Sequence, residues 1–182
     1  MDTTPFFVAL FVHLSFLVLG FGSVLVTDLY GLLWVWDRVR FPQVVKLSAV
    51  TQWFIWAGWG GMVAAGIPLI LLKGVVDELM VVKLFFVVMI GVNGLVLHRL
   101  HKQVEGYQDG DEVPPRLMFR LMLSLGVSQL GWWGAVAIGF LHRHVQSVIT
   151  WPEAPWLMIG LIVGALLVIW KGGEAVVRRV WA

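Results

Sequence analysis

The chain contains no cysteine, which excludes disulfide bonds, thiolate metal sites and cysteine-bound iron–sulfur clusters. Charged residues are scarce as well: they make up 13% of the sequence, whereas a soluble domain has about a quarter. The sequence also lacks a phosphate-binding loop, the nucleophile elbow of hydrolases and a basic patch typical of nucleic-acid binding. We therefore expect no nucleic acid among the partners of this protein.

Long apolar runs take the place of these features. Hydrophobic residues make up 59% of the chain, and the mean hydropathy is +0.87. Apolar runs of about 18 residues or more are typical of transmembrane helices. We predict an all-α integral membrane bundle, a single transmembrane domain over residues 1–182 with the lipid bilayer as its partner. Its five predicted spans cover residues 5–34, 45–72, 78–100, 117–141 and 156–170.

The basic residues predict the orientation of these five spans. The N-terminus and the loops after spans two and four share one side, which holds only Lys73 and Arg143. Because basic residues stay cytoplasmic, we predict an N-terminus outside and a C-terminus inside a bacterial-type inner membrane. Residues 1–5 lack the basic region of a signal peptide, so the first span is expected to be retained. The basic residues on the predicted inner side are Arg38, Arg40, Lys46, Arg99, Lys102, Arg116, Arg120, Lys171, Arg178 and Arg179.

Lys83 is an ionisable residue within an otherwise apolar predicted span. At the bilayer centre such a side chain costs about 2.5–3.5 kcal/mol unless it faces protein, water or a ligand. Counted from the predicted outer ends of their spans, Lys83 and His13 lie at comparable depth in the outer half of the membrane. The lysine could line a site by pairing with a propionate or relaying protons, or it could extend to the interface.

His13 is the histidine placed well inside a span, and it is followed at helical spacing by Gly20. A stripe of small residues lets either another backbone or a flat ligand approach. The glycine-rich second span adds Trp53, Trp56 and Trp59, which could wall a planar ligand. An imidazole in such a place could ligate haem iron or copper. Alternatively, His13 hydrogen-bonds a neighbouring helix.

The remaining polar residues of the spans indicate helix packing more than chemistry. An amide within a span must find hydrogen-bond partners, so Asn93 is predicted to join two helices, and the pair Ser128-Gln129 is interpreted in the same way. Met118 and Met122, one turn apart, are typical of ordinary packing rather than of a copper(I) site. The other histidines are predicted to lie at the two membrane surfaces: His98, His101, His142 and His144.

The first and third spans also resemble a known family. His13 within residues 13–22, and Lys83 within residues 83–100, with Asn93 and the Arg99–Leu100 ending, are similar to the CopD/HemJ-like group of small bacterial membrane proteins. The resemblance covers about a third of the chain, and residues 26–30 differ from the HemJ pattern. It implies that His13 and Lys83 are the positions that matter.

Three functions follow from the residues and the resemblance together. HemJ-type proteins are haem-b-containing oxidoreductases, which implies His13 as the axial metal ligand and Lys83 as the catalytic residue. The small-residue stripe and the glycine-rich span add Gly20, Trp56 and Trp59 as cofactor-binding residues. CopD-type proteins are associated with copper uptake, which implies copper and ion transport instead. The third function is an accessory membrane subunit, paired with another subunit or with a second copy of itself.

Overall fold

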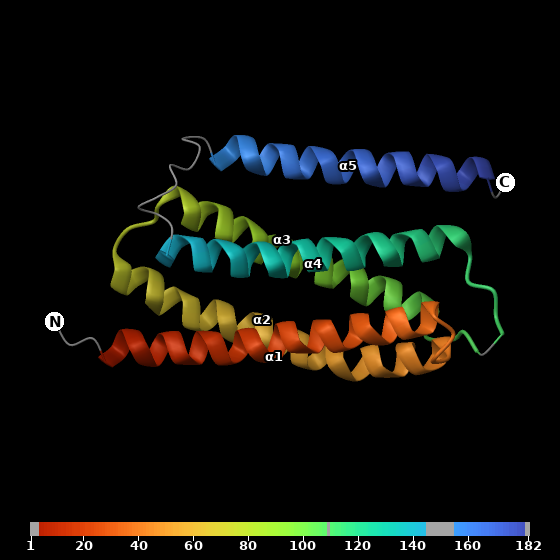
Figure 1. The fold of residues 1–182 in the computed structure, drawn as a ribbon, viewed down its shortest axis with the longest axis horizontal. Helices are drawn as coiled ribbons and strands as arrows, with labels where there is room; N and C mark the ends of the chain where they lie inside the picture. The colour runs from red at the N-terminus through yellow and green to blue at the C-terminus, as the bar shows by residue number, and fades with distance from the viewer. Residues whose placement is uncertain (1–3, 109, 145–154, 181–182) are drawn as a thin grey trace. The chain divides into compact units, whose positions relative to one another are not determined.

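The computed structural model describes residues 4–108, 110–144 and 155–180. These residues form five helices and no strand (Figure 1). Each helix is long and apolar enough to cross a membrane. The predicted all-α class with five membrane-length helices is therefore confirmed. The helices are α1 (Thr4–Val35), α2 (Phe41–Lys73), α3 (Glu78–Val104), α4 (Pro115–His144) and α5 (Pro155–Val180).

Local signals in the sequence explain where α2 ends and α3 begins. Gly74 follows α2 with a φ of 72°, and its N–H donates to the Ile70 carbonyl oxygen at 3.0 Å. Only glycine adopts this left-handed conformation without steric cost, so it is the usual residue after a helix. The carboxylate of Asp77 then accepts a hydrogen bond from the N–H of Met80 at 2.9 Å, which caps the first turn of α3.

The helices extend beyond the spans predicted from hydropathy. α2 begins at Phe41 rather than at residue 45, because Pro42 is favoured in a first turn. α5 continues to Val180 rather than ending at residue 170. The prediction counted only the apolar run, whereas the charged tail keeps helical geometry. Arg178 and Arg179 lie in its last turn, where positively charged side chains stabilise the C-terminal end of a helix.

The chain divides into two compact units, each of which is described by itself. The first comprises Met1–Val76 and His101–Asp111, and therefore contains α1 and α2. The second comprises Asp77–Leu100 and Glu112–Ala182, and contains most of α3 together with α4 and α5. All residues predicted to bind a cofactor belong to the first unit, whereas Lys83 belongs to the second.

In the first unit, α1 and α2 pack through glycine. A Cβ at Gly58 would overlap the backbone of Gly20, and a Cβ at Gly61 would overlap the ring of Phe16. Contacts with later α2 residues fall on earlier α1 residues, so the two helices are antiparallel. Because lipid is as apolar as the protein interior, close van der Waals packing at small residues holds such helices together.

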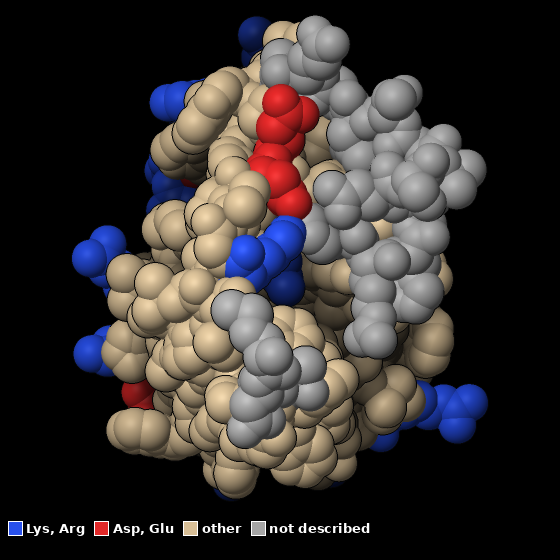
Figure 2. Space-filling model, turned by 90° about the vertical axis from the view of Figure 1, so that its left-hand side faces the viewer, with Lys and Arg blue, Asp and Glu red and all other residues tan. Residues whose placement is uncertain are grey.

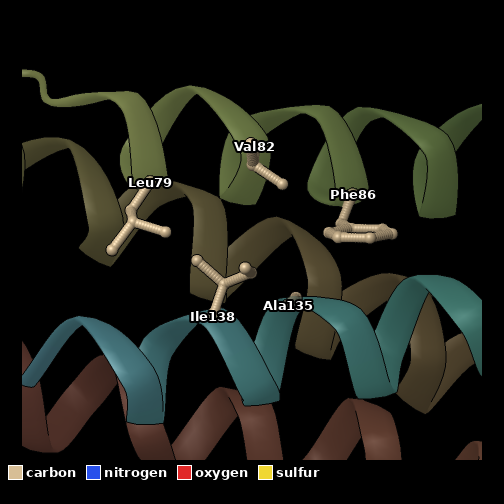
Figure 3. Packing of buried hydrophobic residues seen from close by; sticks show 5 residues of the cluster. All are labelled: Leu79, Val82, Phe86, Ala135 and Ile138. Atoms are coloured by element: carbon tan, nitrogen blue, oxygen red, sulfur yellow. The ribbon is translucent and has the colours of Figure 1, made fainter. Parts of the chain in front are cut away.

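The second unit repeats this principle between α3 and α4. Figure 3 shows Leu79, Val82 and Phe86 of α3 pointing toward Ala135 and Ile138 of α4. These five residues form a buried cluster, and the Phe86 ring lies where a side chain at residue 134 would be. Four partly buried apolar residues pack against the cluster, two from α3 and two from α5: Phe85, Met89, Met158 and Ile162.

Large apolar side chains remain exposed along the helices. Phe11 and Val18 of α1 are each 73% exposed, and Val168 of α5 is 72% exposed. Figure 2 looks from the left-hand side of Figure 1 onto the helix ends, and even there Lys, Arg, Asp and Glu account for a small part of the coloured surface. Exposed apolar surface of this extent is unfavourable in water and favourable in lipid. The surface therefore fits a multi-pass membrane protein.

Candidate functional site

The imidazole of His13 crosses from α1 to the backbone of α2. Its Nδ1 lies 2.8 Å from the carbonyl oxygen of Met62. Because a carbonyl oxygen can only accept a hydrogen bond, Nδ1 carries the proton and donates it. The lone pair of the neutral ring is then on Nε2. Donation of the other ring N–H to a carbonyl is the usual arrangement of a metal-ligating histidine, and it also suits a histidine that only joins two helices.

Gly66 lies beside this hydrogen bond. A carbonyl within a helix already accepts the N–H four residues later, so Met62 normally pairs with residue 66. A Cβ at Gly66 would lie 3.5 Å from Cε1 and 3.6 Å from Nδ1 of His13. Both are ordinary van der Waals distances, so the imidazole lies next to Gly66 and would also have room beside an alanine there. The Met62 oxygen accepts from His13 with its second lone pair. The position of Gly66 beside His13 was not identified from the sequence, although its place in the glycine-rich run was.

Gly20 lies two turns beyond His13 on the same face of α1. Seven residues correspond to about 10 Å along a helix, so Gly20 is not beside the imidazole. The backbone of Gly20 occupies the space that a Cβ at Gly58 of α2 would need. The sequence predicts either another backbone or a flat ligand beside the small-residue stripe. At Gly20 the structure has the backbone of another helix. Gly20 thus brings the helices close enough for His13 to reach Met62.

The predicted tryptophan wall is arranged unevenly around α2. Trp53 is 75% exposed. Trp56 and Trp59 are partly buried, and their rings meet edge to face with centroids 5.6 Å apart. Trp59 precedes Met62 by three residues, so it lies on a neighbouring part of the helix surface. Trp59 is therefore the tryptophan nearest to the His13 hydrogen bond by helical position.

Farther along the same helix pair, hydroxyl groups join α1 and α2. The Thr27 and Thr51 hydroxyl oxygens are 2.7 Å apart, and Thr51 is buried. One turn away, Ser48 donates to the Val45 carbonyl oxygen, so its hydroxyl accepts from Nδ1 of His101 at 3.1 Å. The sequence predicted an interfacial position for His101, and this serine partner was not foreseen.

Lys83 extends across to α4. Its Nζ lies 3.7 Å from the position of a Cβ at Gly139, and the residue is partly buried. Gly139 lies within α4, which ends at His144. The side chain of Lys83 therefore packs against α4 within the unit.

Asn93 joins α3 to α4, as predicted. Its Nδ2 donates to the carbonyl oxygen of Ser124 at 2.7 Å, and both residues are buried. Ser128, one turn along α4, is buried as well. The amide therefore gives two apolar helices a fixed register, which is the role that polar side chains commonly have in membrane bundles.

A polar cluster of the second unit was not predicted. Glu174 of α5 is buried, and its carboxylate accepts from Arg116 at 2.9 Å and from Arg120 at 2.6 and 2.8 Å. The indole N–H of Trp170 donates to the same carboxylate at 3.2 Å. The signal was present in the sequence, since arginines one turn apart on one helix suit a carboxylate on another. We call Arg116, Arg120 and Glu174 the arginine clamp.

Two of the predicted residues are the histidines that follow the apolar part of α4. The side chains of His142 and His144 lie outside the described residues. Among the side chains that the structure describes, no group of three or more His, Cys, Asp or Glu residues is placed to hold a metal ion.

Comparison of the chain with protein-family models, with curated proteins and with solved structures found no match. The functional argument consequently depends on the residues themselves.

Proposed function

We propose that the protein is a bacterial-type inner-membrane protein that binds haem b through His13 and takes part in a redox reaction. The observation that carries this proposal is the Nδ1–H hydrogen bond from His13 to the Met62 carbonyl oxygen. It fixes the ring orientation and leaves the ligating lone pair on Nε2. The resemblance of residues 13–22 and 83–100 to the CopD/HemJ-like group supports the same function.

The donor set fits this group. A porphyrin supplies the equatorial ligands of its own iron, so one imidazole of the correct tautomer is sufficient on one side. A bound haem would supply one-electron redox chemistry. In this proposal His13 holds the iron, the hydrogen bond to Met62 increases the basicity of the imidazole, and partly buried Trp59 excludes water nearby. Lys83 is proposed to hold or transfer a proton within its own unit.

The absorption spectrum of the purified protein tests the proposal. Wild-type protein from cells supplied with haem and copper should show a Soret band. His13→Ala should lose most of the bound haem because it removes the iron ligand, whereas the folded protein should still insert. Gly60→Ala is the matched control, since nothing lies within 4 Å of a Cβ at that position; it should keep the spectrum. Copper without a Soret band would support ion transport instead.

The proposal is wrong if wild type binds neither haem nor metal, or if His13→Ala keeps an unshifted spectrum. Either result would leave His13 as a residue that joins α1 to α2. Lys83→Met should retain the haem and reduce turnover with a redox partner. Equal turnover in wild type and Lys83→Met would show that Lys83 takes no part in the reaction. The assignment of His13 as the ligand would then still be tested by the absorption spectra.

The orientation is a separate prediction. With five spans and ten of thirteen Lys and Arg residues assigned to one side, that side should be cytoplasmic. A fluorescent reporter fused after Ala182 should be active in the cytoplasm, and an exported phosphatase inserted at His144 should be active outside. A fluorescent reporter after Ala182 together with an inactive phosphatase at His144 would place both positions in the cytoplasm and would contradict the five-span topology.

A further inference from the structure

The arginine clamp carries more positive charge than its carboxylate balances. Each guanidinium group has five N–H donors, and Glu174 takes one from Arg116 and two from Arg120. The Arg116 side chain is 51% exposed and the Arg120 side chain 37%, whereas the Glu174 side chain is 9% exposed. The buried carboxylate therefore orients the two guanidinium groups from the inner side of the cluster, and their remaining N–H donors face the surface of the unit.

Further basic side chains lie at the same end of the unit. The start of α4 and the end of α5 lie side by side (Figure 1), as the ion pairs require. Lys171 lies 4.8 Å from the ring centroid of Trp170, and Arg178 donates to the Glu174 carbonyl oxygen at 3.2 Å. The N-terminus of α4 adds the partial positive charge of its backbone N–H groups. Together these groups make an environment that favours an anion.

The clamp also lies at the depth expected of lipid headgroups. Trp170 follows the apolar run of α5, and tryptophan is enriched at the boundary between hydrocarbon and headgroups. Glu174 is one turn beyond it. On α4, the apolar run begins directly after Arg116. The exposed guanidinium groups are therefore level with the phosphates of the adjoining leaflet, where basic pockets between helices bind anionic lipids.

We propose that Arg116 and Arg120, oriented by Glu174, bind the phosphate group of an anionic phospholipid. A guanidinium group offers paired N–H donors that match phosphate oxygens, and it is less strongly hydrated than an ammonium group. The net positive charge of the clamp selects an anionic headgroup over a zwitterionic one. Binding would place one lipid over the contact between α4 and α5.

Native mass spectrometry of the delipidated full-length protein in detergent tests this inference. Wild type is titrated with phosphatidylglycerol, with phosphatidylcholine and with inorganic phosphate. We expect phosphatidylglycerol to bind with the highest affinity, and Arg116→Gln to weaken it about five-fold. The clamp keeps the Arg120 hydrogen bonds in this variant. Arg99→Gln, which removes an equal charge from an exposed side chain on the same predicted side, should bind as wild type does.

Equal affinities for phosphatidylglycerol in wild type and Arg116→Gln would overturn the inference, as would equal binding of phosphatidylcholine. Displacement of the lipid by millimolar inorganic phosphate would identify a site for a free anion instead. If Arg116→Gln does not fold, Arg116→Lys keeps the charge and removes the paired donors, so it should bind the lipid more weakly than wild type. The ratio of the wild-type affinities for phosphatidylglycerol and phosphatidylcholine then shows, without any variant, whether binding requires an anionic headgroup.

Discussion

Gly58→Ala is expected to lower the free energy of unfolding by about 3 kcal/mol, at the upper end of the range for overpacked interiors. The added Cβ would overlap the backbone of Gly20 and approach the Phe16 carbonyl oxygen. Backbone atoms cannot rotate away as the end of a flexible side chain can, so α1 and α2 must separate. Helix content against the mole fraction of dodecyl sulfate in mixed micelles measures this loss.

Gly60→Ala provides the matched control on the same helix. Nothing lies within 4 Å of a Cβ at that position. Since alanine is favoured over glycine within a helix by about 0.5–1 kcal/mol, this variant should be as stable as wild type or slightly more stable. Equal stability of Gly58→Ala and Gly60→Ala would show that the close approach of α1 and α2 contributes nothing.

Glu174→Ala is expected to lower the free energy of unfolding by about 2 kcal/mol. The substitution leaves Arg116 and Arg120 facing each other without their counter-charge, and it removes the acceptor of the Trp170 indole N–H. Removal of one partner from a fully buried ion pair costs about 3–5 kcal/mol. The expected loss is smaller here because both arginine side chains reach solvent, which screens their repulsion. The same mixed-micelle unfolding experiment measures it.

Two further variants separate charge from shape in this cluster. Glu174→Gln keeps a hydrogen-bond acceptor of similar size, so its loss should be intermediate. Glu112→Ala removes an exposed carboxylate in the same unit, and its effect should stay within about 0.5 kcal/mol. A loss in Glu112→Ala as large as that in Glu174→Ala would indicate a general charge effect rather than the clamp.

The sequence predicted the helices well because length and hydropathy determine them. Apolar runs identified all five helices, and the cost of an unpaired amide in lipid predicted that Asn93 joins two helices. Helix ends were predicted less well, since α5 continues as a helix after its apolar run ends.

Contacts between helices could not be predicted in the same way. In a soluble protein the apolar face of a helix identifies its buried side, whereas a membrane helix is apolar on the lipid side too. Nothing in the spacing of His13 therefore indicated that its partner is the Met62 carbonyl oxygen. The choice of Gly58 over the neighbouring Gly60 as the contact for Gly20 likewise depends on helix orientation, which hydropathy does not determine.

The contacts between α1 and α2 have a consequence for biosynthesis. Gly58 with Gly20, Met62 with His13, and Thr51 with Thr27 all lie within the first 73 residues. This hairpin can therefore assemble in the bilayer while the ribosome is still elongating the chain. At 5–20 residues per second, synthesis from residue 74 to residue 180 takes roughly 5–20 s. The His13–Met62 contact can thus form while the later helices are still emerging from the ribosome.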